Sequence, residues 1–180
     1  MDRTARTALT ALTTGALLLA AAAPARADVE AFPDRRSDTS HPADVVKVRV
    51  EHTDRVVVAV HHDNLTFHDG PGYLRIAYDT GPRYEGPEFY LRIWYQTDRP
   101  IDLRRAEGWG TLHAGPIASC TGETADVSAR RNVTSVGVPR ACFGNPPRVR
   151  VHVRLRPFPR DDRKVDVAPA SRTMGPWVRR

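Results

Sequence analysis

The stretch 148–156 constrains the fold most strongly, because its side chains alternate strictly between basic and apolar. It reads Arg-Val-Arg-Val-His-Val-Arg-Leu-Arg, so Val149, Val151, Val153 and Leu155 share one side of an extended strand. Successive side chains of a strand point to opposite faces, whereas a period of about 3.6 residues would scatter these apolar residues around a helix. The stretch therefore predicts a β-strand with one face in a core and its basic face in water.

Other segments show similar alternation and are separated by residues typical of turns. The further expected strands are 44–51, 55–61, 73–80, 88–96, 109–113, 117–121, 126–130 and 132–138. No segment has a convincing helical period. Short strands at intervals of about 8–12 residues are typical of a sandwich or barrel. We therefore predict an all-β fold, an antiparallel β-sandwich of jelly-roll or immunoglobulin-like type with about eight strands.

The segment 1–27 has the pattern of a secretory signal peptide. Two arginines precede an apolar run over 8–23, and Ala25-Arg26-Ala27 forms an A-x-A cleavage site. A membrane anchor is the alternative, but the apolar run is shorter than the roughly 20 residues that span a bilayer. We expect cleavage after Ala27, a secreted extracellular protein, and no transmembrane segment in the mature chain.

The composition of the remaining chain indicates one domain with a short segment on either side. Residues 28–42 are polar and interrupted by prolines, which predicts a flexible N-terminal arm. Residues 43–163 contain the expected strands and form the β-sandwich domain, and residues 164–180 form a basic C-terminal tail. A chain of this size can bury roughly 70% of its unfolded surface, which is enough for a core.

Cys120 and Cys142 are the two cysteines of the chain. In an oxidising compartment two cysteines most often form a disulfide, and two free thiols are the alternative. Two cysteines cannot supply the four ligands of a structural zinc site, and no histidine spacing completes one.

The run 132–151 reads Asn-Val-Thr-Ser-Val-Gly-Val-Pro-Arg-Ala-Cys-Phe-Gly-Asn-Pro-Pro-Arg-Val-Arg-Val. It resembles a group of small secreted actinobacterial (Streptomyces-like) proteins of unknown function, with Pro-Arg-x-Cys-hydrophobic-Gly-x-Pro between two valine-rich strands. The stretch 43–48 and the basic residues near Trp177 fit the same group, whereas Arg148 stands where the group commonly has an aromatic residue. The resemblance implies a β-sandwich with a link between the two cysteines, and it implies no catalytic residue.

Two sets of polar residues could form a metal-binding or a catalytic site. The stretch 61–69 contains imidazole and carboxylate side chains that suit divalent ions, but its spacing matches no described site. Ser119, His113 and Asp102 could form a hydrolytic triad, but the chain has no Gly-x-Ser-x-Gly motif. We therefore expect no catalytic residue, no metal site and no cofactor.

The strand pair 73–80 and 88–96 contains a candidate ligand-binding face. If each strand buries its more apolar alternate side chains, the outward set is Tyr73, Arg75, Tyr90, Arg92 and Trp94. Flat aromatic faces beside arginine donors suit sugar rings, and an exposed aromatic cluster usually marks an interaction site. The alternative is that a second layer of the fold, such as the tail with Trp177, covers these rings.

The charges are interleaved along the chain, which has a formal net charge of +6, so nucleic acid is not the expected partner. The basic face of 148–156 could hold anionic cell-wall polymers, although such charges also serve solubility and discourage edge pairing. We predict a secreted, non-catalytic protein that binds an extracellular glycan, a cell-envelope component or a protein. A small secreted hydrolase with an unrecognised site is the alternative, and the sequence does not indicate an oligomeric state.

We predict that Cys120 and Cys142 are oxidised to one disulfide in the secreted protein. Mass spectrometry of the non-reduced mature chain is expected to show the loss of two hydrogens. Closing the loop between them would stabilise the fold by about 3 kcal/mol in the chain-entropy model, so reduction should lower the melting temperature. Two alkylatable thiols in freshly secreted protein would contradict the prediction.

Overall fold

The computed structural model describes residues 28–39, 43–66, 71–95, 101–112, 120–157 and 164–180. Its strands are β1 (Asp28–Pro33), β2 (Val45–His52), β3 (Arg55–His62), β4 (Pro71–Asp79), β5 (Phe89–Trp94), β6 (Asp102–Glu107), β7 (Thr111–Leu112), β8 (Thr124–Ser128), β9 (Val133–Pro139), β10 (Arg148–Pro157), β11 (Asp166–Ala168) and β12 (Val178–Arg179). Two short 3-10 helices, η1 (Ala129–Arg131) and η2 (Arg140–Phe143), flank β9.

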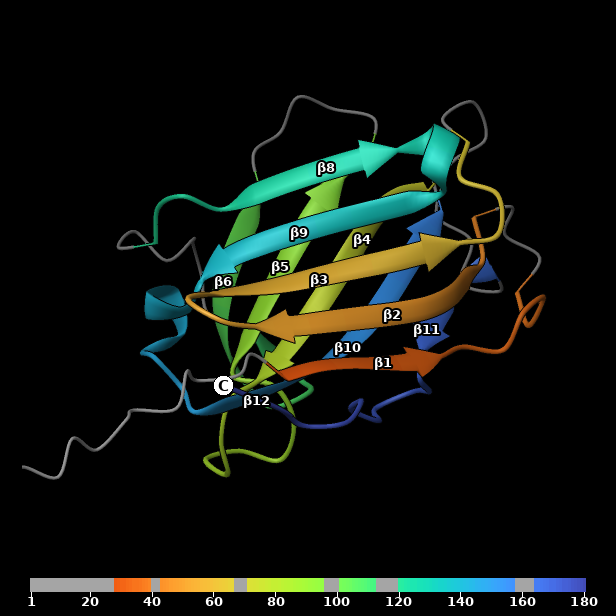
Figure 1. The fold of residues 1–180 in the computed structure, drawn as a ribbon. Coiled ribbons are helices and arrows are strands. Elements are labelled where there is room, and N and C mark those ends of the chain that lie inside the picture. Colours follow the sequence, from red (N-terminus) through yellow and green to blue (C-terminus); the bar gives the residue numbers. More distant parts are fainter. Residues whose placement is uncertain (1–27, 40–42, 67–70, 96–100, 113–119, 158–163) are drawn as a thin grey trace, which may run out of the picture.

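The strands form two antiparallel sheets that face each other, and the strands of one sheet run across those of the other (Figure 1). The five-stranded sheet has the order β1-β2-β3-β9-β8. The seven-stranded sheet has the order β11-β10-β4-β5-β6-β7, with β12 also pairing to β10. Among the described strands the chain passes between the sheets three times, after β3, after β7 and after β9, and these crossings tie the sheets together. The predicted antiparallel β-sandwich is confirmed, with more strands than expected.

The core lies between the two sheets and consists of alternate side chains from each strand. The four inward residues of β10, Val149, Val151, Val153 and Leu155, are fully buried as predicted. Valines of the first sheet meet larger aliphatic and aromatic residues of the second, a pairing that suits the half-buried faces of strands. Other buried members of this cluster are Val48, Val50, Val56, Val58, Val60, Leu74, Ile76, Tyr78, Leu91, Leu103, Val136 and Val138.

The alternation in β2 contains an irregularity that the sequence does not reveal. A strict period of two would place Val46 on the same face as Val48 and Val50. The pairing of β2 with β3 instead shifts between Val45 and Lys47, so Val45 is buried and Val46 is only half-buried. A bulge of this kind adds one residue to a strand and reverses the faces beyond it.

Both ends of the described chain belong to the sandwich, which corrects the expected flexible arm and separate tail. Within 28–42, residues 28–33 form β1, and every residue of β1 pairs with β2. Within 164–180, β11 and β12 both pair with β10. These edge strands are too short, or too exposed on both faces, to produce a clear alternation. In β1 only Phe32 is buried, so backbone hydrogen bonds hold the strand in place.

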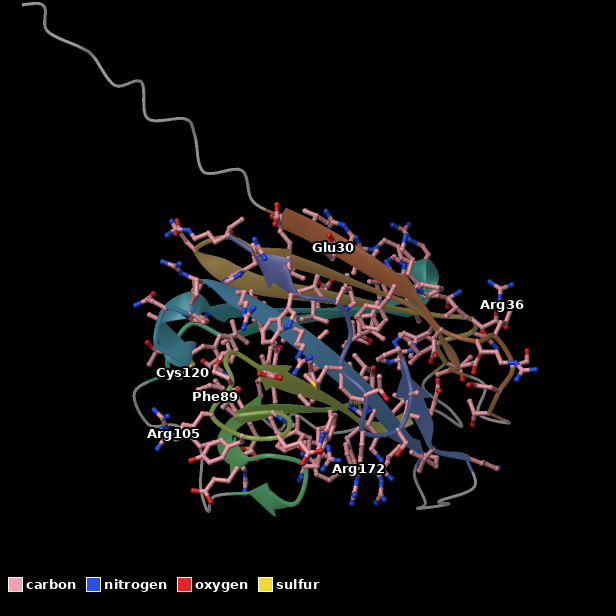
Figure 2. All side chains as sticks on the ribbon, turned by 90° about the horizontal axis from the view of Figure 1, so that it is seen from below. Glu30, Arg36, Phe89, Arg105, Cys120 and Arg172 are labelled. Carbon is pink, nitrogen blue, oxygen red and sulfur yellow. A yellow bond between two sulfur atoms is a disulfide. The ribbon has the colours of Figure 1, made fainter. Side chains whose placement is uncertain are left out.

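The disulfide between Cys120 and Cys142 is formed, with 5.0 Å between the two Cα atoms. It joins the segment before β8 to η2 at one end of the sandwich (Figure 2). No helix of the described residues is long and apolar enough to span a membrane. The expected signal peptide, residues 1–27, lies outside the described residues.

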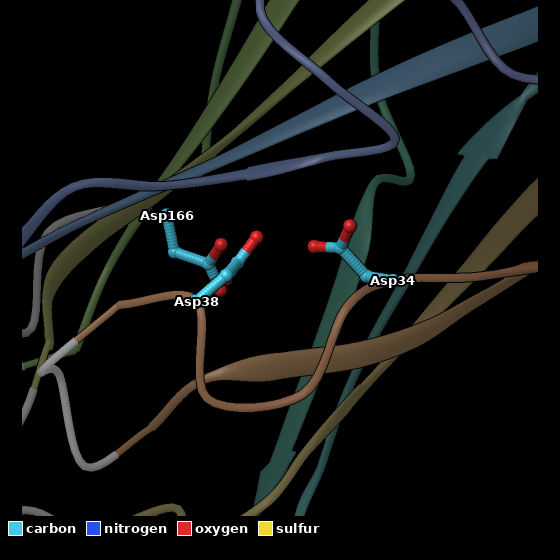
Figure 3. A group of neighbouring side chains, drawn as sticks. All are labelled: Asp34, Asp38 and Asp166. Atoms are coloured by element: carbon cyan, nitrogen blue, oxygen red, sulfur yellow. The ribbon is translucent and has the colours of Figure 1, made fainter.

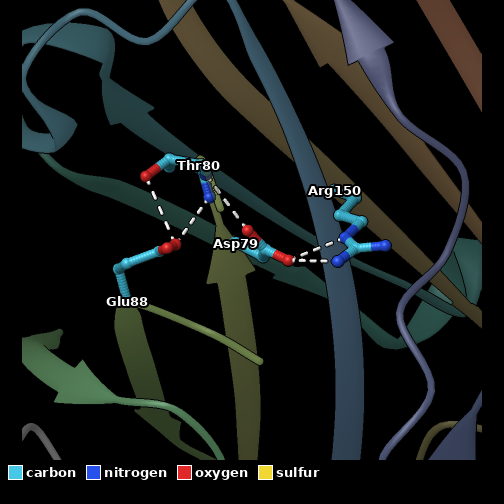
Figure 4. A network of polar contacts seen from close by, with 5 residues as sticks. Asp79, Thr80, Glu88 and Arg150 are labelled. Atoms are coloured by element: carbon cyan, nitrogen blue, oxygen red, sulfur yellow. Dashed lines mark hydrogen bonds and ion pairs between the residues drawn. The ribbon is translucent and has the colours of Figure 1, made fainter. Parts of the chain in front are cut away.

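A polar network on β4 and β10 shows that the basic face of 148–156 is not simply solvated (Figure 4). Asp79 is fully buried, and its Oδ2 accepts from Arg150 Nε at 2.7 Å and lies 2.6 Å from Arg150 Nη2. Its Oδ1 accepts from the backbone N–H of Gly81 at 3.1 Å. The Arg150 guanidinium also lies 4.4 Å from the ring centroid of Trp177. Arg150 therefore neutralises a buried charge rather than serving as a solvent-exposed cation.

We expect Arg150→Ala to destabilise the protein by about 3 kcal/mol, because removal of one partner leaves the buried Asp79 carboxylate uncompensated. Urea unfolding at pH 7 would measure the loss. Arg131→Ala is the matched control, because its ion pair with Asp126 has a similar distance of 2.6 Å but is exposed, with side-chain exposures of 63% and 66%. The control should cost less than about 1 kcal/mol. Equal losses in the two variants would contradict the structural role of the Arg150–Asp79 pair.

Candidate functional site

A row of three arginines crosses the outward face of the second sheet. Arg154 of β10 pairs in register with Arg75 of β4, and Arg75 pairs with Arg92 of β5. Neighbouring strands lie about 4.8 Å apart, so the three side chains start from adjacent positions on one face. Asp102 of β6 is in register with Arg92, but its carboxylate pairs with Arg104 at 2.7 Å. The Asp102 carboxylate is therefore engaged by Arg104, outside the row.

An aromatic pair lies beside this row. Tyr73 of β4 is opposite Trp94 of β5, and their ring centroids are 5.1 Å apart. The Arg92 guanidinium carbon lies 5.1 Å from the Tyr73 centroid and 5.5 Å from the Trp94 centroid. Both rings are half-buried. On the side of β4 away from β5, Arg156 of β10 is in register with Tyr73. We call this surface the arginine–aromatic face; its residues are Tyr73, Arg75, Arg92, Trp94, Arg154 and Arg156.

Tyr90 belongs to the predicted outward set but is not available to a ligand. It points to the same side of the sheet, yet only 5% of the residue is exposed. Its hydroxyl donates to the carbonyl of Gly108 at 3.5 Å, and the Arg75 guanidinium lies 4.8 Å from its ring centroid. Burial raises the pKa of the Tyr90 hydroxyl. The expected second layer therefore covers Tyr90 and leaves Tyr73 and Trp94 partly accessible.

The second layer above the sheet is not the one that the sequence suggests. Trp109, in the turn between β6 and β7, contacts His152 edge-on with 5.1 Å between ring centroids. His152 is only 5% exposed, so the strictly alternating strand does not present this side chain to water as predicted. Trp177 instead lies against the Arg148 and Arg150 guanidinium groups, at 4.1 Å and 4.4 Å. One end of the outward face of β10 is thus covered, and the arginine–aromatic face occupies the other.

His152 is held neutral by its surroundings. Burial, followed by the positive charges of Arg75 and Arg154, lowers its pKa to about 4. Both arginines that contribute to this shift, Arg75 and Arg154, belong to the arginine row.

A concavity lies elsewhere, between the β4–β5 connection and β6. Its volume is about 360 Å³, and its lining includes Glu88, Arg105 and Glu107. Glu88 Oε2 accepts from the backbone N–H of Thr80 at 2.7 Å, and burial, followed by the charge of Asp79, raises the pKa of Glu88. This carboxyl closes the turn between two strands (Figure 4), so it has a structural role.

Of the three residues considered for a hydrolytic triad, Asp102 is bound to Arg104, whereas Ser119 and His113 lie outside the described residues.

The start of the histidine-rich stretch 61–69 contributes to the core. His62 is 4% exposed, and its Nδ1 donates to the carbonyl of Ala43 at 2.9 Å. Because that nitrogen carries the proton, Nε2 accepts from the Thr134 hydroxyl at 3.1 Å, whose oxygen in turn accepts from the Tyr95 hydroxyl at 2.8 Å. These contacts connect the two sheets, and residues 67–70 lie outside the described residues.

Comparison of the chain with protein-family models, curated proteins and solved structures found no match. The fold and the surface described above define an all-β sandwich with one disulfide and a basic, aromatic face on its larger sheet. The resemblance to secreted actinobacterial proteins stays a prediction.

We expect His152 to make stability depend on pH between about 6.5 and 4. Because the folded pKa lies below the unfolded value, the stabilising contribution is complete above about pH 6.5 and is lost as the pH falls toward 4. Unfolding free energies at pH 7 and pH 5 should differ by about 2 kcal/mol more in the wild type than in His152→Asn. Other titrating groups are common to both proteins and cancel. Identical pH dependence would refute the buried neutral state of His152.

Proposed function

We propose that this protein is a secreted, non-catalytic β-sandwich that binds an acidic extracellular glycan or another anionic cell-envelope polymer through the arginine–aromatic face. The observation that carries the proposal is the row of Arg75, Arg92 and Arg154 beside the adjacent, tilted rings of Tyr73 and Trp94. Secretion is supported by the signal-peptide pattern of residues 1–27 and by the disulfide, which is typical of oxidising compartments.

The chemistry of the face matches two parts of such a ligand. A guanidinium group can donate two parallel hydrogen bonds to a carboxylate or a phosphate, and it stays charged at any physiological pH. The rings of Tyr73 and Trp94 provide flat apolar surfaces for the apolar face of a sugar, with polar atoms at their edges. A polymer that alternates sugar rings with anionic groups would use both kinds of contact.

The position of the arginines also favours an extended ligand. They come from three adjacent strands of one sheet, so the positive charges follow a line across the strands rather than converging on one point. Small-molecule sites are usually concave and enclose most of their ligand. A half-exposed row on a sheet is better suited to a chain that continues beyond both ends of the contact.

The test is sedimentation of the purified mature protein with insoluble polysaccharides that differ in charge. Wild-type protein should be retained by an acidic polymer and released by salt, because exposed charge interactions weaken as ionic strength rises. Arg92→Ala should weaken retention about tenfold, which corresponds to the loss of one charge-assisted hydrogen-bonded contact of about 1.4 kcal/mol. Trp94→Ala should weaken binding to the same polymer without altering its dependence on salt.

Two controls separate binding from folding and charge. Arg131→Ala removes one positive charge from the exposed end of η1, away from the second sheet, and should bind as the wild type does. The same polymer with its carboxyl groups reduced to alcohols should lose the salt-dependent part of the retention. Equal retention of wild type, Arg92→Ala and Trp94→Ala, with unchanged melting temperatures, would refute the assignment to this face. Failure of the wild type to bind any acidic polymer would refute the ligand class.

A further inference from the structure

Three carboxylates from distant parts of the sequence meet at one edge of the sandwich (Figure 3). Asp34 and Asp38 lie in the connection from β1 to β2, and Asp166 begins β11 in the other sheet. One oxygen from each lies within 4.8 Å of the others, and Figure 3 shows the carboxylates directed toward one another. Asp166 is 2% exposed, and its Oδ2 accepts from the backbone N–H of Val45 at 2.6 Å. The group is therefore partly built into the core.

A fourth carboxylate, that of Asp44, lies against this group with one oxygen unused. Asp44 is 3% exposed, and its Oδ2 accepts from the backbone N–H of Ser37 at 2.6 Å. Its Oδ1 is buried and has no hydrogen-bond partner among the described residues. The Asp44 side chain lies beside that of Asp38. A buried, unused carboxylate oxygen beside three other carboxylates indicates that a positively charged partner belongs there.

The charge of the group is not balanced by the described part of the protein. Asp34 Oδ2 is buried and has no hydrogen-bond partner among the described residues. The neighbouring Arg36 pairs with Asp63, at 3.5 Å, rather than with this group. Placing several carboxylates together without a cation is costly, and the usual solutions are a bound metal ion or a shared proton.

We propose that Asp34, Asp38 and Asp166 bind a calcium ion, with Asp44 supplying a buried acceptor beside it. Calcium prefers six to eight oxygen ligands at about 2.4 Å, so two ligands on opposite sides of the ion are about 4.8 Å apart. The three oxygens satisfy this limit, and the group offers carboxylate oxygens alone, which favours a hard cation over zinc or copper. Water can complete the surroundings of the ion.

The position of the site gives the ion a defined effect. Asp34 and Asp38 follow β1 of the first sheet, whereas Asp166 belongs to β11 of the second, so one ion connects the two sheets at this edge. Extracellular calcium modules bind with dissociation constants of about 10⁻⁴–10⁻³ M, a range that suits a secreted protein. Calcium would thus hold the edge strands β1 and β11 in place, independently of the arginine–aromatic face.

The experiment compares melting temperatures of the mature protein in EDTA, in about 10 mM CaCl2 and in MgCl2 of equal ionic strength. Calcium should raise the melting temperature by at least about 2 °C, because a ligand that binds only the folded state stabilises it. Magnesium should have a smaller effect, because its shorter bonds need a tighter octahedral arrangement. A calorimetric titration with CaCl2 should give one site per chain.

The variant Asp38→Asn removes one exposed carboxylate of the group with little change in shape. It should lose the calcium-dependent rise in melting temperature, while its melting temperature in EDTA stays the same or increases, because repulsion is relieved. Asp126→Asn, an exposed aspartate of β8, is the control and should keep the full response. If Asp38→Asn does not fold, Asp34→Asn serves instead. If the wild type melts at the same temperature in EDTA and in calcium, the carboxylates share protons and hold no ion. The same conclusion follows if the Asp38→Asn variant shows the full calcium-dependent rise in melting temperature.

Discussion

The organisation of this protein depends on the alternation of apolar and basic side chains along β10. Its inward residues fill the centre of the core, and its backbone pairs with β4 on one side and with β11 and β12 on the other. Because the side-chain period of a strand is two, a shift of one register position would bring arginines into the core. The register of β10 therefore determines the position of nearly every other element of the larger sheet.

The outward face of β10 contains residues that stabilise the fold and residues that belong to the proposed binding face. Arg150 neutralises the buried Asp79, and His152 is covered by Trp109, so these positions contribute to stability. Arg154 continues into a row with Arg75 and Arg92. A single alternating pattern thus supplies both a structural ion pair and the positive charge of the proposed binding face.

The two proposed sites differ in how the structure compensates their charge. On the arginine–aromatic face, the rings of Tyr73 and Trp94 lie beside the Arg92 guanidinium and leave it partly accessible to an anion. In the acidic group, Asp44 and Asp166 are almost completely buried, and neighbouring carboxylates increase the cost of ionisation. The first arrangement favours a large ligand held at the surface, and the second favours a small cation held between the sheets.

The sequence alone predicted the all-β class, the disulfide between the two cysteines and which side chains of β10 face the core. These features depend on local alternation and on composition. The sequence also predicted that Tyr73, Arg92 and Trp94 share a face, since β4 and β5 are consecutive antiparallel strands. Tertiary structure alone decided that Tyr90 and His152 are covered, because the residues that cover them come from turns without periodicity. It alone brought Asp166 to Asp34 and Asp38, since no spacing rule relates carboxylates that lie on different sheets and far apart in the chain.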